Sequence, residues 1–417
     1  MSDRIIAHYR VETASDVHRA AEIMAGEQSS GTFVKVPGET PELAERSGAR
    51  VEVIEMLEPA DLPSLPGSIA TAGKPWQRAN VTLSWPLENI GASLPNLLAT
   101  IAGNLFELQQ FSGLRLLDFE LPAAFFQRYQ GPQFGIAGTR SLSGVSKGPL
   151  IGTIVKPSVG FDADQTAGLV KTLAEAEIDF IKDDELQANG SHCPFAARVA
   201  AVMAVINAHA DRSGKKVMFA FNVTGDLDEM RRHHDIVLAA GGTCIMASLN
   251  SIGLIGMTEL RRHAQLPIHA HRNGWGYLSR HPQLGWSYVA WQKIWRLAGA
   301  DHMHVNGLAN KFAEADDSVI ASAKACLTPM SQDHPCRVMP VFSSGQTVHQ
   351  PPETFRRLGS LDLIYAAGGG IMGHPDGPAA GVRSLRESWD ATVAGIPLAA
   401  YATTHPALAN ALSVRRR

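Results

Sequence analysis

One short stretch joins a buried strand to a charged cluster: Phe180-Ile181-Lys182-Asp183-Asp184-Glu185. Its apolar start, which follows Ile178, predicts a strand buried within a sheet. Side chains alternate across a strand, so Lys182 and Asp184 share a face, and Glu185 follows where the strand becomes a loop. Two carboxylates at a strand end suit a hard divalent cation such as Mg²⁺, which prefers oxygen ligands. A strand end held only by structural salt bridges would have the same composition, so the choice between a metal site and a salt bridge depends on the rest of the chain.

The composition is that of a soluble globular enzyme, with 417 residues, 45% hydrophobic and 18% charged. The net charge of −3 gives no basic surface for nucleic acid, and no apolar run is long enough to span a bilayer. The N-terminus lacks an apolar signal core. We therefore expect a cytoplasmic protein with no nucleic-acid or membrane partner, and free thiols at its four scattered cysteines.

Two patterns of secondary structure divide the chain into predicted domains at 1–122 and 148–417. The first predicts a compact α+β domain of ferredoxin-like type, with helices on one face of a sheet. Its expected strands are 4–11, 33–36, 51–56, 80–85 and 114–121, and its expected helices are 14–24 and 94–108. The segment 123–147 is rich in loop-forming residues, and we expect it to connect the domains.

In the second domain, short apolar strands alternate with amphipathic helices. The expected strands are 152–156, 180–184, 216–223, 243–249, 267–272, 302–306, 337–343 and 363–367. The expected helices are 162–177, 196–208, 227–239, 257–264, 288–297, 318–327, 351–358 and 379–394. Eight strand–helix units in about 270 residues predict a (β/α)8 TIM barrel. An open doubly wound sheet is the alternative, and it is disfavoured because nearly every strand ends in polar or glycine residues.

Barrels of this kind place catalytic groups at the carboxyl ends of their strands. The first strand ends at Lys156, which could serve acid–base chemistry. Later strands carry His269-Ala270-His271-Arg272 and His302-Met303-His304, so paired histidines share a face on each strand. Arg272 could bind a phosphate or a carboxylate through its fork of N–H groups. Lone core histidines are usually only hydrogen-bonded, but two consecutive His-x-His strands are less easily explained that way.

Glycine-rich backbone follows the last two strands, at Ser343-Ser344-Gly345 and at Gly368-Gly369-Gly370. Barrel enzymes commonly bind phosphate there through exposed N–H groups, although three glycines could also form only a flexible turn. Lys311 lies on the loop after the sixth strand and could close over a substrate. Metal-dependent amidohydrolases also combine His-x-His with a modified lysine. In those enzymes the His-x-His pair precedes the lysine, whereas both pairs here follow Lys182. This order of residues disfavours a zinc hydrolase.

Together these motifs resemble the large chain of ribulose-bisphosphate carboxylase over nearly the whole sequence. Gly152-Thr153-Ile154-Val155-Lys156-Pro157 is similar to that family's catalytic-lysine motif, and 179–185 is similar to its metal motif. The resemblance implies that CO₂ carbamylates Lys182, so that Lys182, Asp184 and Glu185 hold Mg²⁺. It implies catalytic roles for Lys156, Lys182, His271 and Lys311. It implies substrate or phosphate contacts for Arg272, His304, Ser344, Gly345, Gly368 and Gly369.

The resemblance also implies how subunits assemble. Glu27, Thr32 and Asn104 match residues that family members insert into the barrel of the neighbouring subunit. We therefore expect a homodimer whose active sites are shared across the interface, and no small subunit.

Several positions depart from the family's pattern. Near the catalytic lysine, Ser158 replaces the carboxylase's lysine and Ile154 replaces its threonine. Elsewhere, Trp275 replaces a histidine, Gln346 a glycine and Phe33 a tryptophan. The metal centre and the enolising lysine are kept while their surroundings change. This predicts a carboxylase-like enzyme rather than a CO₂-fixing carboxylase.

The resemblance implies enediolate chemistry on a phosphorylated keto sugar acid. We expect a Mg²⁺-dependent lyase of sugar breakdown, similar to the carboxylase-like enzymes that decarboxylate, or transcarboxylate and hydrolyse, 3-oxo-isoapionate 4-phosphate. One alternative is an isomerase or enolase of methylthio-sugar phosphates in methionine salvage. Another is an inactive regulatory or scaffolding dimer. The last is disfavoured because an inactive site has no physical need for the joint presence of Lys156, Lys182, Asp184, Glu185, His271 and Lys311.

Overall fold

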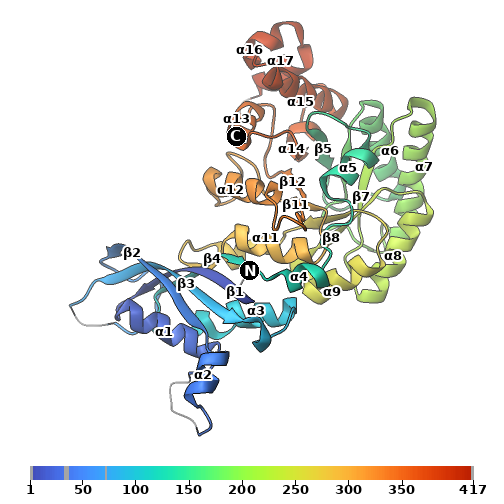
Figure 1. The fold of residues 1–417 in the computed structure, drawn as a ribbon. Helices are drawn as coiled ribbons and strands as arrows, with labels where there is room; N and C mark the ends of the chain where they lie inside the picture. The colour runs from blue at the N-terminus through green and yellow to red at the C-terminus, as the bar shows by residue number, and fades with distance from the viewer. Residues whose placement is uncertain (1–2, 32–36, 71–72, 415–417) are drawn as a thin grey trace. The chain divides into compact units, whose positions relative to one another are not determined.

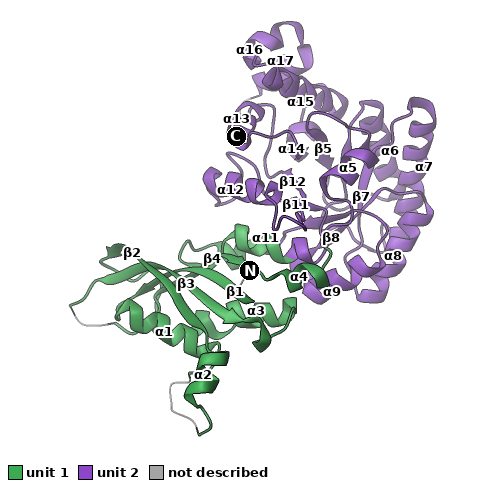
Figure 2. Ribbon diagram, viewed as in Figure 1, with its two compact units in different colours: residues 1–130, 274–294 green, residues 131–273, 295–417 purple. Residues whose placement is uncertain are grey.

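The computed structural model describes residues 3–31, 37–70 and 73–414 (Figure 1). The chain forms two compact units, which Figure 2 colours separately. Unit 1 comprises Met1–Gln130 and Gly274–Ile294, and unit 2 comprises Gly131–Asn273 and Trp295–Arg417. Among the described residues, every helix is too short or too polar to cross a membrane.

Unit 1 is built on a five-stranded sheet in the order β10-β4-β1-β3-β2. β1 pairs antiparallel with β3 and β4, β3 pairs antiparallel with β2, and β10 joins β4 in parallel. The strands are β1 (Arg4–Thr13), β2 (Arg50–Ala60), β3 (Trp76–Pro86), β4 (Gly113–Glu120) and β10 (Leu284–Trp286). The helices are α1 (Val17–Glu27), α2 (Pro41–Ser47), η1 (Leu87–Asn89), α3 (Leu94–Ala102), η2 (Asn104–Glu107), α4 (Ala123–Arg128), α10 (Trp275–Ser279) and most of α11 (Tyr288–Leu297).

Alternate residues of β1 are buried, as expected for a sheet with helices packed on one face. α1 packs against β2 and β3, and the Tyr9 hydroxyl of β1 donates to the Ile101 carbonyl of α3 at 2.7 Å. The predicted α+β domain is thus confirmed, although the expected strand 33–36 lies outside the described residues. The expected helix 94–108 is wrong in its second half, since α3 ends at Ala102. The backbone leaves the helix at Gly103, where a Cβ would lie 2.3 Å from the Ala99 carbonyl oxygen.

Unit 2 is a closed barrel of eight parallel strands, in the order β11-β12-β13-β5-β6-β7-β8-β9, which confirms the predicted TIM barrel. The strands are β5 (Leu150–Ile154), β6 (Phe180–Lys182), β7 (Met218–Asn222), β8 (Cys244–Ser248), β9 (Ile268–His271), β11 (His302–His304), β12 (Met339–Phe342) and β13 (Ile364–Ala366). The helices that follow them are α6 (Ala163–Glu175), α7 (Phe195–Ser213), α8 (Leu227–Ala239), α9 (Leu249–His263), α12 (Asp316–Leu327), α13 (Pro351–Leu358), α14 (Gly368–Met372) and α15 (Pro378–Val393). The chain ends with α16 (Leu398–Tyr401), η3 (Ala402–Thr404) and α17 (Pro406–Ser413).

The barrel interior is a packed apolar core. Its fully buried members come from six strands, namely Leu150, Phe180, Met218, Ala220, Cys244, Met246, Met339, Val341, Ile364 and Ala366. Burying a large apolar side chain contributes about 1.5–3 kcal/mol, so this cluster supplies much of the stability of unit 2. Ile136 and Leu142, on helix α5 (Gly135–Ser143), pack against the same cluster. All four cysteines are buried free thiols, as expected.

Two segments differ from the sequence-based expectations. The stretch 123–147, expected to be a loop-rich connector, contains the helices α4 and α5. A residue far along the sequence caps the start of α5. The N–H groups of Phe134 and Gly135 donate to Asp301 Oδ1 at 2.7 and 2.8 Å. The second segment, Gly274–Ile294, lies inside the predicted barrel domain but groups with unit 1, where β10 pairs with β4.

Candidate active site

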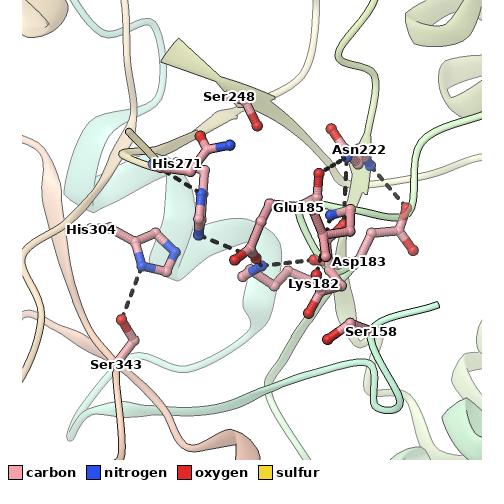
Figure 3. Close-up of polar contacts among 12 residues, drawn as sticks. Ser158, Lys182, Asp183, Glu185, Asn222, Ser248, His271, His304 and Ser343 are labelled. Atoms are coloured by element: carbon pink, nitrogen blue, oxygen red, sulfur yellow. Dashed lines mark hydrogen bonds and ion pairs between the residues drawn. The ribbon is translucent and has the colours of Figure 1, made fainter. Parts of the chain in front are cut away.

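The carboxyl ends of β5 and β6 bring two lysines and two carboxylates together at the barrel mouth. Lys156 Nζ lies 2.5 Å from Asp184 Oδ2 and 2.7 Å from Ser158 Oγ. Lys182 Nζ lies 2.8 Å from the Asp183 carbonyl oxygen and 3.4 Å from Glu185 Oε2 (Figure 3). The lysines differ in exposure, because the Lys182 side chain is 1% exposed and that of Lys156 is 39% exposed.

Burial and charge shift the pKa values of this cluster in different directions. Burial lowers the pKa of Lys182, although the carboxylates of Glu185 and Asp184 raise it in part. Burial raises the pKa of Glu185, but the charges of His271 and Lys182 outweigh it and lower that pKa to about 2. Burial and Lys182 together lower the pKa of His271 to about 4. Glu185 is therefore an anion at neutral pH, and Lys182 is more readily deprotonated than an ordinary lysine.

Asp183 lies between Lys182 and Asp184 in the sequence, and its buried hydrogen bonds anchor the cluster. Asp183 points into the protein, where its Oδ2 accepts from Arg198 Nη2 at 3.1 Å and from the Asn222 N–H at 2.9 Å. Arg198, on α7, also donates to the carbonyls of Ala188 at 2.7 Å and Cys193 at 3.1 Å. These bonds hold the loop after β6, which carries Glu185. Sequence reasoning gave Arg198 no role, since only the fold brings it to Asp183.

The histidines of β9 and β11 complete one side of the site. His271 Nε2 lies 3.5 Å from Glu185 Oε2, and the rings of His271 and His304 are 4.5 Å apart between centroids. Figure 3 shows the ring of His304 facing Ser343, and His304 Nδ1 lies 3.0 Å from Ser343 Oγ. His304 Nε2 lies 2.8 Å from His269 Nε2. The structure therefore brings His271 and His304 to the Lys182 cluster.

Arg272 binds a carboxylate of the chain itself. Its Nη2 lies 2.5 Å from Glu314 Oε2, which also accepts from Asn306 Nδ2 at 2.6 Å. Glu314 lies on the loop after β11 that carries Lys311. The sequence gave no signal for this pair, because a lone glutamate in a loop has many ordinary roles.

The loops after β11, β12 and β13 place the remaining candidates of unit 2. The Lys311 N–H donates to the Ser344 carbonyl at 3.3 Å, and a Cβ on Gly345 would lie 3.7 Å from the Lys311 nitrogen. A Cβ on Gly368 would lie 4.0 Å from Lys156 Cε. Gly369 follows within α14. The candidates thus form two groups, one around Lys311 and one around Lys156.

The candidates of unit 1 also lie together. Asn104 Nδ2 donates to Glu27 Oε1 at 3.2 Å. Glu27 ends α1, and Asn104 begins η2 and is exposed. Thr32, the third candidate of this group, lies outside the described residues.

One further group in the described part of the chain has metal-ligand chemistry: His234, Asp235 and His263. The Gln265 N–H donates to His234 Nε2 at 2.9 Å, so the proton of the neutral imidazole lies on Nδ1. That Nδ1–H points to Asp235 Oδ1 at 2.9 Å, which also contacts His263 Nε2 at 2.7 Å. The His234 lone pair is therefore already used, and the group is a hydrogen-bonded trio.

The fold and the charged mouth define a barrel protein with a candidate active site at the carboxyl ends of its strands. Residues 1–125 match the family model of the ribulose bisphosphate carboxylase large chain, N-terminal domain, and residues 135–414 match that of its catalytic domain. The chain belongs to the ribulose bisphosphate carboxylase large-chain family.

Relatives within this family differ in the functions for which they are named. The chain is 61% identical to a 3-oxo-isoapionate-4-phosphate transcarboxylase/hydrolase of Xanthobacter autotrophicus, over 100% of both chains. It is 46% identical to a 3-oxo-isoapionate-4-phosphate decarboxylase of Rhizobium rhizogenes, over 97% of both. The crystal structure of a rubisco-like protein from Burkholderia fungorum superposes with a TM-score of 0.92 at 49% identity, covering 99% of this chain and 100% of that one. Solved members of the family include carboxylases described as dimeric and as octameric.

Proposed function

We propose that this protein is a Mg²⁺-dependent enzyme of enediolate chemistry that acts on 3-oxo-isoapionate 4-phosphate. Its reaction is the cleavage of a carbon–carbon bond, by decarboxylation or by transcarboxylation with hydrolysis. The names of the relatives at 61% and 46% identity support this substrate. The cluster of Lys156, Lys182, Asp184 and Glu185 at the barrel mouth is the observation that carries the proposal.

The donor set fits a hard cation once Lys182 is carbamylated. Both carboxylates already face lysine nitrogens, since Asp184 Oδ2 contacts Lys156 Nζ and Glu185 Oε2 contacts Lys182 Nζ. The lowered pKa of Lys182, which burial causes, favours the neutral amine that attacks CO₂. The nitrogen lone pair forms the new C–N bond, and the amine releases a proton to solvent. The carbamate of Lys182, with Asp184 and Glu185, would hold Mg²⁺, which supplies Lewis-acid stabilisation of negative charge on substrate oxygens.

The other residues bind the substrate and move its protons. Lys156 Nζ holds the proton that is exchanged with the substrate, and Ser158 Oγ orients that nitrogen at 2.7 Å. His271, beside Glu185, faces the same space. Lys311, on an exposed loop, closes over the bound substrate. The phosphate and the other oxygens of the substrate are bound by Arg272, Ser344, Gly345, Gly368 and Gly369, and His304 acts on them through the Ser343 hydroxyl, which lies 3.0 Å from its Nδ1.

The chemistry is tested by NMR of the protein with Mg²⁺, bicarbonate and 3-oxo-isoapionate 4-phosphate, beside a Lys182→Ala control. Release of CO₂ and appearance of a ketotetrose phosphate in the wild type alone would establish the decarboxylase. Glycolate-type fragments would establish transcarboxylation and hydrolysis. If the substrate is unchanged while solvent deuterium enters a methylthioribulose phosphate, the isomerase or enolase alternative replaces this proposal.

We further propose a cytoplasmic homodimer in which Glu27, Thr32 and Asn104 complete the partner's site. Asn104 is exposed and bonded to Glu27, so the pair is available at the surface of unit 1. Mixing the inactive variants Lys182→Ala and Glu27→Gln tests the shared site. Random pairing makes half of the dimers mixed, with one intact site each, and should restore about a quarter of wild-type activity. An active Glu27→Gln variant, or a mixture that stays inactive, would contradict the shared site.

A further inference from the structure

A chain of hydrogen bonds runs through the interior of unit 2, from the mouth of the barrel to its floor. Ser343 follows the carboxyl end of β12, and its Oγ lies 3.0 Å from His304 Nδ1. His304 Nε2 lies 2.8 Å from His269 Nε2, and His269 Nδ1 lies 3.4 Å from His302 Nδ1. At the amino end of β11, His302 Nε2 lies 2.8 Å from Thr139 Oγ1, on α5. The members of the chain are at most 5% exposed.

The far end of the chain fixes its direction. The Thr139 hydroxyl bonds the Gly135 carbonyl, and it must donate, since a carbonyl only accepts. With its single hydrogen used there, Thr139 Oγ1 can only accept from His302, so His302 carries its proton on Nε2. The bare Nδ1 of His302 then requires a proton on His269 Nδ1, because two lone pairs would otherwise face each other across 3.4 Å.

The proton positions nearer the mouth are fixed in the same way. His269, protonated on Nδ1, has a bare Nε2 that accepts from His304 Nε2–H. His304 is then left with a bare Nδ1, which accepts from the Ser343 hydroxyl. These proton positions are those of neutral imidazoles, and burial favours the neutral form, since it lowers the pKa of all three histidines and that of His302 to about 3.

We propose that His269, His302 and Thr139 are positioning residues, which hold His304 as its Nε2–H tautomer with a lone pair directed to Ser343. His304 therefore acts on the site through Ser343, rather than by donating to a phosphoryl oxygen. The chain is not a proton path to solvent, because the Gly135 carbonyl cannot take up a proton. This role rests on the proposed function, since it assumes that the mouth binds substrate, but the tautomer itself does not.

The tautomer is measured on the wild-type protein by NMR of histidine side chains labelled with ¹⁵N, with His304 assigned by a His304→Asn variant. The expected result is a protonated Nε2 and a bare Nδ1 on His304. A protonated Nδ1 on His304 would overturn the proposal. This measurement needs neither substrate nor turnover, so it stands even if the proposed reaction fails.

The influence of the floor on the mouth is tested with Thr139→Val. The variant removes the acceptor for His302, so the His304 signals should change and kcat should fall about fivefold, the loss of one hydrogen bond, with KM nearly unchanged. Thr139→Ser should restore both.

Thr166→Val is the matched control, since Thr166 is also fully buried and its hydroxyl also bonds the carbonyl four residues earlier, that of Asp162 at 2.7 Å. It should lower thermal stability without moving kcat or the His304 signals. If Thr139→Val behaves like this control, the proposal is overturned. If Thr139→Val does not fold, the tautomer of His304 measured by NMR on the wild-type protein still tests the proposal.

Discussion

Replacing Arg198 by methionine should destabilise the barrel strongly, because it leaves a buried carboxylate without its cation. Arg198 and Asp183 are both 0% exposed, and Arg198 Nη2 and Nε lie 3.1 and 3.3 Å from Asp183 Oδ2. Burial raises the pKa of Asp183, and Arg198 lowers it in part. Methionine fills a similar apolar volume but supplies no charge and no donors.

The magnitude follows from the burial of both partners. Breaking a fully buried ion pair by removing one member costs about 3–5 kcal/mol. For a domain of this size each kcal/mol lowers the melting temperature by roughly 2–4 °C, so a fall of about 6–20 °C is expected. Protonation of Asp183 limits the loss in the variant, so the stability deficit should shrink as pH falls and Asp183 takes up a proton.

Urea unfolding followed by circular dichroism measures this cost. The double variant Asp183→Asn/Arg198→Met should be more stable than Arg198→Met alone, because it leaves no unpaired charge buried. Arg356→Met is the matched control, since its ion pair with Glu353 is exposed and should matter little. The reasoning is refuted if Arg198→Met is as stable as Arg356→Met, or if the double variant is the least stable of the three.

Three further predictions concern the site and its surroundings. Burial lowers the pKa of His302 to about 3 from an unfolded value of 6.5, so the unfolded chain binds the extra proton between these values. The contribution of the neutral, buried His302 to folding stability is therefore complete above about pH 6.5 and is lost as pH falls toward 3. A urea unfolding midpoint that does not change over that pH window would contradict this prediction. Glu314→Gln removes the carboxylate that occupies Arg272. The KM for the phosphorylated substrate should fall about threefold or more, and an unchanged or higher KM would show that the pair is only structural. Ser158→Ala removes an acceptor of Lys156, so kcat should fall about fivefold and Ser158→Thr should recover it. Steady-state rates equal to the wild type would exclude an orienting role for this hydroxyl.

The barrel could be predicted because each strand is a short apolar run bounded by turn residues. All eight expected strands overlap the observed ones, and three expected helices, 227–239, 288–297 and 351–358, have the observed bounds. The errors lie where a distant residue decides the local structure. Helix α5 begins where Asp301 caps it, some 166 residues along the chain from Gly135. No local pattern in 123–147 could have shown that cap.

The same distinction applies to the site. Lys182, Asp184 and Glu185 could be grouped as candidates from the sequence because they are nearly adjacent, so one strand end is enough to bring them together. His269 and Glu314 were not given roles, because their partners depend on which strands are neighbours and on how the loops fold. The hydrogen bond between His269 and His304 requires β9 to pair with β11, which only the closed barrel provides.

The strand end at Lys182 carries both the side chains of the candidate site and the buried ion pair that supports them. Alternation along the strand sends Lys182 and Asp184 to the mouth and Asp183 to Arg198. A shift of one residue would point Asp183 at the mouth and bury Asp184 without a cation, so the buried pair selects the register that builds the site. A substitution at Asp183 should therefore reduce activity although its side chain faces Arg198 and not the candidate site. The loss should follow the displacement of Asp184 and Glu185 rather than the loss of a catalytic group.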